Sequence, residues 1–176
     1  CVYPDQDGVL WIATYGGGLN RLKNGRFTVY SSKQGLFRDN LFWILEDDNA
    51  KLWLSCNDGI FSVPKDDLNS YAKGNISTLS CTVYNELDGM KNAECNGGTQ
   101  PAGWKGRDGR LWFATLDGVV VIDPNDLNYD LTPPALTFER IRANDLSVDL
   151  ALKDSEIILS PGGGDLEIKY TAPQFR

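Results

Sequence analysis

The sequence predicts an all-β protein made of repeated antiparallel strands, and three observations support this fold class. A Leu-Trp pair recurs at positions 10–11, 52–53 and 111–112, each time after a polar turn. A glycine-containing turn and a second short apolar stretch follow each pair. The three tryptophans are 42 and 59 residues apart. Repeats of roughly 40–50 residues, each with four short strands, are typical of the blades of a β-propeller.

Each repeat is expected to contain a hairpin, because Gly and Asn-Asp-Gly supply the positive φ that tight turns require. A small residue before each turn would let neighbouring blades approach closely. A large aromatic side chain at the same place in every repeat is typical of packing between twisted sheets. We therefore expect three tryptophans to form the structural core of the blades: Trp11, Trp53 and Trp112.

The remaining parts of each blade follow in order along the chain. Arg26–Tyr30 alternates in polarity and predicts an outer strand, and Asn40–Asp47 predicts a loop that enters the innermost strand of the next blade. The second repeat is longer than the first, and the extra residues fall around Lys65–Asn75. Pro64 and the polar residues after it predict a short helical turn there. Thr78–Tyr84 then resumes the strand pattern.

The repeat ends after Ile122, where prolines at 124, 133 and 134 disfavour both helix and central strand. The segments 135–143, 146–150, 156–160 and 165–170 predict four further short strands, with a turn at 161–164. They lack the Leu-Trp signature. We expect the last two to three blades of a propeller in residues 1–132 and the N-terminal part of a second β domain in residues 133–176. Because Cys1 leads almost at once into a turn, we also expect the chain to be part of a longer protein.

Composition and charge exclude several classes of function. The net charge is −7 and no basic cluster occurs, so neither nucleic acid nor an anionic membrane is an expected partner. No apolar run reaches the roughly 18 residues of a membrane-spanning helix. The chain contains no histidine, which removes the commonest general base and zinc ligand. We expect no cofactor and no metal.

The four cysteines, Cys1, Cys56, Cys81 and Cys95, show no CxxC spacing, so neither a zinc nor a redox motif is expected. Three complete pairings are possible, and the sequence does not choose among them. Small buried hydrophobic residues are the simplest interpretation. A bridge between Cys81 and Cys95 is an alternative if the protein is exported.

No motif indicates catalysis. The carboxylates at 46–48 end a strand and enter a turn, which predicts a solvated turn. The glycine runs at 16–18 and 162–164 predict hairpins, since no helix or Lys-Ser/Thr pair follows them. Binding is better supported, because the loops that enter the innermost strands surround one mouth of a propeller. Aromatic, amide and charged groups there suit a sugar. The candidate ligand-binding residues are Arg38, Asp39, Asn40 and Trp43 at one entry, and Glu94, Asn96, Thr99 and Gln100 at the next.

These features resemble the two-component regulator propeller family, whose repeat combines an acidic strand end, a Gly turn, Leu-Trp-Ile-Gly-Thr and a Gly-rich turn. Asp7–Leu19 and Ile44–Asp47 match this repeat, although Ala13, Ser55 and Ala114 replace its glycine. Asp88–Gly98 is similar to a late blade junction, and Gly118–Pro124 to the final blade strand. Residues from Pro133 onward resemble the start of the small immunoglobulin-like domain, named for three tyrosines, that follows such propellers. The resemblance thus implies a partial propeller followed by an incomplete immunoglobulin-like β-sandwich.

The resemblance implies a non-catalytic, extracytoplasmic, ligand-sensing segment of a bacterial receptor. The receptor would be a sensor histidine kinase, a hybrid two-component system or a diguanylate cyclase. The implied location is the periplasm, the implied ligand an oligosaccharide or another small polar molecule, and the implied assembly a homodimer of the parent. Two alternatives remain: a propeller hydrolase or lyase that acts on polysaccharide, and a purely architectural or dimerisation segment.

Overall fold

A computed structural model describes residues 1–98, 100–127, 137–143, 146–149 and 166–171. The chain divides into two compact units, residues 1–128 and 129–176. The predicted domain boundary at 132/133, the strand at 156–160 and the glycine turn at 161–164 lie outside the described residues, so these remain predictions.

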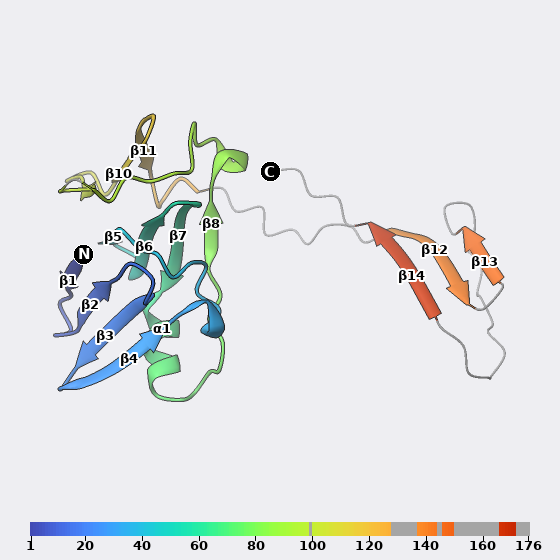
Figure 1. Ribbon diagram of the computed structural model, residues 1–176, viewed down its shortest axis with the longest axis horizontal. Helices are drawn as coiled ribbons and strands as arrows, with labels where there is room; N and C mark the ends of the chain where they lie inside the picture. Colours follow the sequence, from blue (N-terminus) through green and yellow to red (C-terminus); the bar gives the residue numbers. More distant parts are fainter. Residues whose placement is uncertain (99, 128–136, 144–145, 150–165, 172–176) are drawn as a thin grey trace. The chain divides into compact units, whose positions relative to one another are not determined.

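The first sheet of the first unit has four antiparallel strands in sequential order (Figure 1). The Leu-Trp pair opens its second strand, and the predicted outer strand is its fourth. Its elements are β1 (Val2–Pro4), β2 (Leu10–Ala13), β3 (Leu19–Lys23) and β4 (Arg26–Tyr30).

The second sheet repeats this arrangement with an inserted helix. Its strands are β5 (Trp43–Glu46), β6 (Lys51–Cys56), β7 (Gly59–Pro64) and β8 (Thr82–Tyr84). The insertion predicted from the longer repeat is the helix α1 (Lys65–Ala72), between β7 and β8.

A similar short segment leads from each sheet to the next. The 3-10 helices η1 (Ser32–Gln34) and η2 (Glu86–Asp88) both begin with a capping box. Each ends at a glycine in the left-handed region, Gly35 and Gly89, with φ of 93° and 94°.

The third sheet contains three described strands, β9 (Gly103–Lys105), β10 (Leu111–Thr115) and β11 (Gly118–Ile122). The second unit contains one antiparallel sheet of β12 (Thr137–Ala143), β13 (Leu146–Asp149) and β14 (Leu166–Thr171). The predicted all-β fold, a partial propeller followed by a further β unit, is confirmed.

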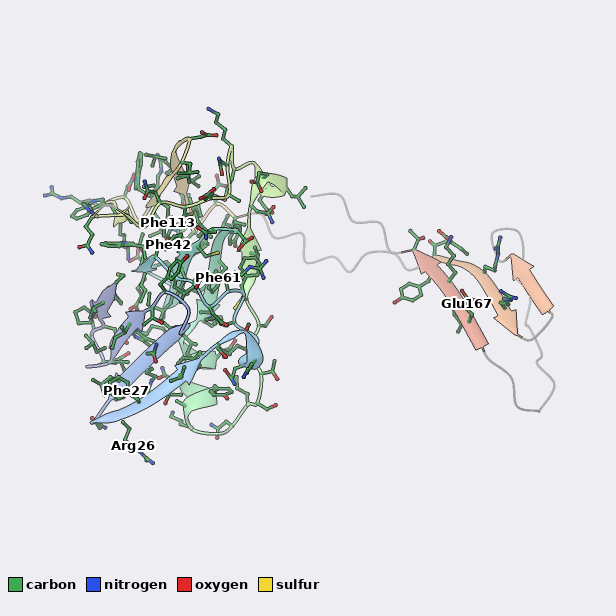
Figure 2. The ribbon with its side chains drawn as sticks, in the orientation of Figure 1. Arg26, Phe27, Phe42, Phe61, Phe113 and Glu167 are labelled. Atoms are coloured by element: carbon green, nitrogen blue, oxygen red, sulfur yellow. The ribbon has the colours of Figure 1, made fainter. Side chains whose placement is uncertain are left out.

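Two hydrophobic clusters join the three sheets of the first unit. The first cluster contains Trp11 with Leu54 and Phe61, and therefore packs the first sheet against the second. The second contains Trp53 with Leu111 and Phe113, and packs the second sheet against the third. Figure 2 shows Phe61 and Phe113 inside this body, whereas Phe27 lies at its outer edge beside Arg26.

Each tryptophan lies in a cross-strand row that we call the indole row of its sheet. The rows are Tyr3-Trp11-Arg21, Leu45-Trp53-Ser62 and Trp104-Trp112-Val121. Trp11 and Trp53 are fully buried, as predicted, because the following sheet covers each. The prediction that Trp112 is a core residue is wrong for the described structure, since this side chain is 40% exposed. Within the described residues of the first unit, no sheet follows the third and covers its row.

A carboxylate six residues before the tryptophan orders the turn in the first two sheets. Asp5 accepts hydrogen bonds from the backbone N–H groups of Asp7 and Val9 and from Nε1 of Trp11, each at 2.9 Å. Asp47 repeats this pattern toward Asn49, Lys51 and Trp53, at 2.9, 2.9 and 2.8 Å. We call each an Asp–Trp pair. The third sheet has Gly106 at the corresponding position and therefore lacks the carboxylate.

Candidate ligand-binding site

A cavity of about 490 Å³ lies where the hairpin turns of the three sheets meet the loops that enter β5 and β9. Each hairpin contributes the residue at its turn: Tyr15 after β2, Asn57 after β6 and Leu116 after β10. The entry loops contribute Phe42 and Trp43 on one side and the segment around Asn96 on the other. Equivalent parts of successive repeats thus converge on this cavity.

Aromatic rings form one side of this cavity. Tyr15 is 75% exposed and stacks on Phe42, with ring centroids 6.3 Å apart and planes inclined by 18°. Gly97 passes close to the same ring, because a Cβ there would lie 2.6 Å from Phe42. The exposed ring of Tyr15 therefore has a supported position and presents an apolar surface to the cavity.

Trp43 adds an unsatisfied donor. Its indole is half-buried, and its Nε1 is buried without a hydrogen-bond partner among the described residues. A buried N–H without a partner costs free energy, on the order of 1–3 kcal/mol. The donor is enclosed by the third sheet, because a Cβ at Gly103 would lie 3.0 Å from this nitrogen.

The polar side of the cavity is formed by the loop before β9. Glu94 and Gln100 are exposed, and Asn96 is half-buried. The Asn96 side-chain oxygen accepts from the backbone N–H of Gly98 at 2.9 Å, and the backbone N–H of Asn96 donates to the carbonyl of Ala114 at 2.8 Å. The loop is thereby fixed to the third sheet. Among the described residues, Glu94 is the only acidic residue in the lining. The other lining residues offer amide, thiol, aromatic and aliphatic groups.

The structure brings together four of the six principal predicted residues, Trp43, Glu94, Asn96 and Gln100. Arg38 is outside the lining, because it pairs with Asp58 at 2.8 Å and lies 4.6 Å from the Phe37 ring centroid. The hydrogen bond to Asp58 raises the pKa of Arg38. Asn40 is also outside the lining and forms an isolated bridge with Tyr15.

Asp39 has a structural position, and Thr99 lies outside the described residues. The Asp39 carboxylate accepts from the N–H and hydroxyl of Ser32 at 2.7 and 2.9 Å. Its carbonyl accepts from the N–H groups of Gly16 and Gly18. These bonds hold the entry loop against the first hairpin.

Tyr15, Phe42 and Asn57 line the cavity but were not among the predicted ligand-binding residues. A signal for two of them exists in the repeat. Tyr15, Asn57 and Leu116 each follow the Thr or Cys that stands three residues after the tryptophan. Because equivalent positions of successive blades lie at the same end of a propeller, aligning this position across the repeats would have predicted that the three residues surround one mouth of the propeller.

A larger hollow of about 610 Å³ runs along the edge strand β11 and the end of η2. Its lining combines acidic residues such as Asp117 and Asp126 with residues of β11. It contains none of the predicted ligand-binding residues and no aromatic cluster like the one at the smaller cavity. We therefore regard the smaller cavity as the candidate site.

The chemistry of the candidate site suits binding. Burial raises the pKa of Cys95, which lines the cavity, to about 12, so its thiol is not a ready nucleophile. Within the described ranges, no group of three or more His, Cys, Asp or Glu side chains could hold a metal ion. None of the helices described here is long and apolar enough to span a membrane.

Comparisons with solved structures support the fold. The chain is 21% identical to the extracellular domain of the hybrid two component system BT3049 from B. thetaiotaomicron, with a TM-score of 0.62, and the match covers 91% of this chain and 20% of that one. The chain is also 21% identical to the extracellular domain of the hybrid two component system BT4673 of the same organism, with a TM-score of 0.57. That match covers 96% of this chain and 27% of the other. The chain thus spans only about a fifth to a quarter of these structures. No curated protein matches the sequence.

The family model described as "Two component regulator propeller" matches residues 1–16. This segment contains β1 and β2, including the first Asp–Trp pair and the first Leu-Trp strand. The structural matches add the arrangement of successive sheets. Residues 1–16 thus match a repeat of the two component regulator propeller family, in agreement with the resemblance predicted from the sequence.

Proposed function

We propose that this chain is a non-catalytic, ligand-sensing segment of the extracytoplasmic, periplasmic part of a bacterial signal-transduction receptor. The receptor would be a sensor histidine kinase, a hybrid two-component system or a diguanylate cyclase that assembles as a homodimer. The observation that carries the proposal is the convergence of two entry loops and three hairpin turns on one cavity beside an exposed, supported Tyr15 ring. The resemblance to extracellular domains of two-component systems supports the same role.

The lining favours an oligosaccharide or another small, polar, uncharged ligand. Aromatic faces bind the apolar face of a sugar ring, and amides pair with its hydroxyls as both donors and acceptors. Tyr15 supplies the ring, and Asn57, Asn96 and Gln100 supply amides. A cavity of about 490 Å³ lies within the size range of small-molecule sites.

The test is a thermal-shift screen of the complete extracytoplasmic region against a panel of neutral glycans. A ligand that binds only the folded state raises its stability by RT ln(1 + [L]/Kd), about 2.7 kcal/mol at a hundredfold excess over Kd. We expect a saturable shift for at least one glycan, without release of new reducing ends.

The Tyr15→Ala variant should abolish this shift, because it removes the exposed ring. Tyr170→Ala is the matched control, since Tyr170 is an exposed tyrosine on β14 of the second unit. A panel without any shift, or a shift that Tyr15→Ala leaves intact, would refute the proposal.

A polysaccharide hydrolase or lyase is the alternative. Glycoside hydrolysis generally uses two carboxyl groups that flank the scissile bond. The cavity lining, among the described residues, contains one, Glu94. Product release that is lost in Glu94→Gln would favour the enzyme over the sensor.

A further inference from the structure

Two buried thiols face the same carbonyl oxygen beside the candidate cavity. Cys56 is the last residue of β6, and its Sγ donates to the carbonyl of Gly59 at 3.3 Å. The Sγ of Cys95, from the loop before β9, donates to the same oxygen at 3.7 Å. Both residues are buried. The two side chains therefore point to one place from two segments that are remote in the sequence.

The main chains are also held together. The N–H of Cys95 donates to the carbonyl of Cys56 at 3.1 Å. This single bond brings the two main chains close together, and antiparallel partners that exchange both such bonds have Cα atoms about 5.5 Å apart. Disulfides typically span Cα separations of roughly 4.4–6.8 Å. The backbone geometry thus suits a cross-link.

The preceding repeat shows which side chains satisfy the fold at the positions of Cys56 and Cys95. There, the N–H of Leu41 donates to the carbonyl of Thr14 at 3.0 Å, and the Thr14 hydroxyl donates to the turn carbonyl of Gly18 at 2.9 Å. Thr14 and Leu41 thus correspond to Cys56 and Cys95. A hydroxyl makes the same hydrogen bond and an aliphatic side chain fills the same buried space, so neither position requires sulfur. Both facing positions nevertheless carry cysteine in the second repeat.

We propose that Cys56 and Cys95 form a disulfide that fastens the loop around Glu94–Asn96 to the β6–β7 turn. The bond forms by thiol–disulfide exchange with a disulfide oxidant such as oxidised glutathione. The two thiols lose two protons and two electrons, an S–S bond forms between them, and the oxidant is reduced to two thiols. The cross-link joins two segments of the cavity wall, and it does not depend on what the cavity binds.

The other cysteines do not offer such a pair among the described residues. The Sγ of Cys81 donates to the carbonyl of Gly35 at 3.5 Å, whereas the Sγ of Cys95 donates to the carbonyl of Gly59. The structure therefore does not bring Cys81 and Cys95 together, contrary to the alternative pairing considered from the sequence. Burial raises the pKa of Cys56 to about 11 and that of Cys95 to about 12. Because exchange requires a thiolate, we expect the bond to form during folding and only slowly in a folded, reduced chain.

The experiment is oxidative refolding of the full chain in a mixture of oxidised and reduced glutathione, followed by acid quenching, alkylation and peptide mass mapping without reduction. We expect a peptide pair linked through Cys56 and Cys95, with Cys1 and Cys81 alkylated. The bond closes a loop of about 40 residues, so reduction should lower the midpoint of thermal unfolding by roughly 5–15 °C. Mapping the chain after secretion into a bacterial periplasm gives the same readout without a refolding step.

The double variant Cys56→Thr with Cys95→Leu carries the residues of the preceding repeat, and its midpoint should not respond to reductant. The double variant Cys1→Ser with Cys81→Ser is the matched control and should keep both the link and the shift. Four alkylated thiols in both preparations would overturn the proposal. A Cys81–Cys95 link, or glutathione adducts as the only oxidised product, would overturn it equally.

Discussion

At the scale of single residues, the Asp–Trp pair explains why the start of each Leu-Trp strand is ordered. The carboxylate of Asp47 accepts hydrogen bonds from two backbone N–H groups of the turn and from the indole N–H of Trp53. Asp47 is itself buried. Removing this acceptor costs more than the net value of one hydrogen bond, because three donors lose their partner and one of them, the indole of Trp53, is fully buried.

We therefore predict that Asp47→Ala lowers the free energy of unfolding by about 2–4 kcal/mol. Asp108→Ala is the control in the third sheet, where the aspartate is exposed and bonds only its own turn and the side chain of Arg110. That change should cost no more than about 0.5 kcal/mol. Urea unfolding followed by tryptophan fluorescence measures both. Equal losses would show that the Asp–Trp pair adds no special stability.

A buried cation adds a second residue-scale device at the junction of the first two sheets. Nζ of Lys65 lies 2.8 Å from Glu46, 3.2 Å from Asp5 and 3.4 Å from Asp7. Burial acts to lower the pKa of Lys65, but hydrogen bonds to Glu46 and Asp5 outweigh it and raise this pKa. Burial, with the neighbouring Glu46 carboxylate, raises the pKa of Tyr3 to about 12. The Lys65 ammonium is therefore charged near neutral pH, and three carboxylates surround it.

The same junction predicts acid sensitivity. Burial acts to raise the pKa of Asp5, but hydrogen bonds from Trp11, Val9 and Lys65 outweigh it and lower this pKa below the ordinary 3.8. A carboxylate with a lowered folded-state pKa stabilises the fold fully above its unfolded pKa, and this contribution is lost as pH falls through the folded value.

We expect stability to fall below about pH 4, and Asp5→Asn to be less stable at neutral pH but flatter in this acid range. Chemical unfolding at pH 6 and pH 3 checks the difference. Asp66→Asn, on the exposed side of α1, is the control and should follow the unmodified chain. An Asp5→Asn variant with an unchanged pH profile would contradict the assignment.

At the scale of elements, α1 ties two sheets together although it is inserted within only one. The hydroxyl of Tyr30, on β4, donates to the carbonyl of Leu68 at 2.8 Å, and its ring lies 5.5 Å from that of Tyr71. Nε of Arg21, on β3, donates to Asn69 at 3.1 Å. The middle and end of the helix therefore contact the preceding sheet, and Figure 1 shows where α1 is inserted, between β7 and β8.

Leu68 is fully buried in this contact. We predict that Leu68→Ala lowers the free energy of unfolding by about 2–5 kcal/mol, because it opens a cavity between α1 and β4. Leu87→Ala makes the same chemical change at a side chain that is 84% exposed on η2, and should have little effect. Calorimetry of both variants tests this, and a mild Leu68→Ala would show that α1 is peripheral.

Much of this element structure was predictable from the sequence, because the strands have a short-range pattern. The Leu-Trp strands, the outer strand and the position of α1 all follow from local alternation, turn residues and the extra length of the second repeat. The contact between Arg21 and Asn69 was not predictable, since nothing local links residues so far apart. Burial of Trp112 failed as a prediction for a related reason: its sequence matches the other repeats, but burial depends on a covering sheet.

The candidate site was predictable only in part. Residues that enter an innermost strand converge as expected for Trp43 and Asn96. Arg38 has a suitable sequence position, but its pairing with Asp58 is a long-range contact that turns it away from the cavity lining. Tyr15 was missed because hairpin turns were interpreted only as turns, and not as a second set of residues around the same mouth.

At the scale of the whole first unit, two apolar sheet faces are uncovered among the described residues. One is the indole row of the third sheet, where Trp104 is 66% exposed beside Trp112 and Val121. The other is the far face of the first sheet, with Val2, Phe27 and Val29. The corresponding faces of the second and third sheets are buried in the two clusters. Inside the unit, the indole-row face of one sheet packs against the far face of the next. The two uncovered faces are therefore one of each kind.

We predict that the chain associates through these faces when studied alone. Light scattering should give a mass that rises with concentration, and either Trp104→Lys or Phe27→Lys should limit the increase. Leu87→Lys, at an exposed site on η2 that belongs to neither face, is the control. An equimolar mixture of the two single variants should form pairs, because each keeps the face that the other lacks. A chain that is monomeric at every concentration would contradict the prediction.

The order in which the sheets cover one another also fixes the symmetry of any such assembly. Each indole row packs against a different kind of surface, the opposite face of the following sheet. Contact between copies through these surfaces is heterologous, so a two-fold axis cannot relate the partners. Every added copy leaves one face of each kind exposed at the ends. Copies therefore add one after another. If the rotation that relates neighbouring copies closes, the assembly is a ring, and if it does not close, the assembly is a helical filament.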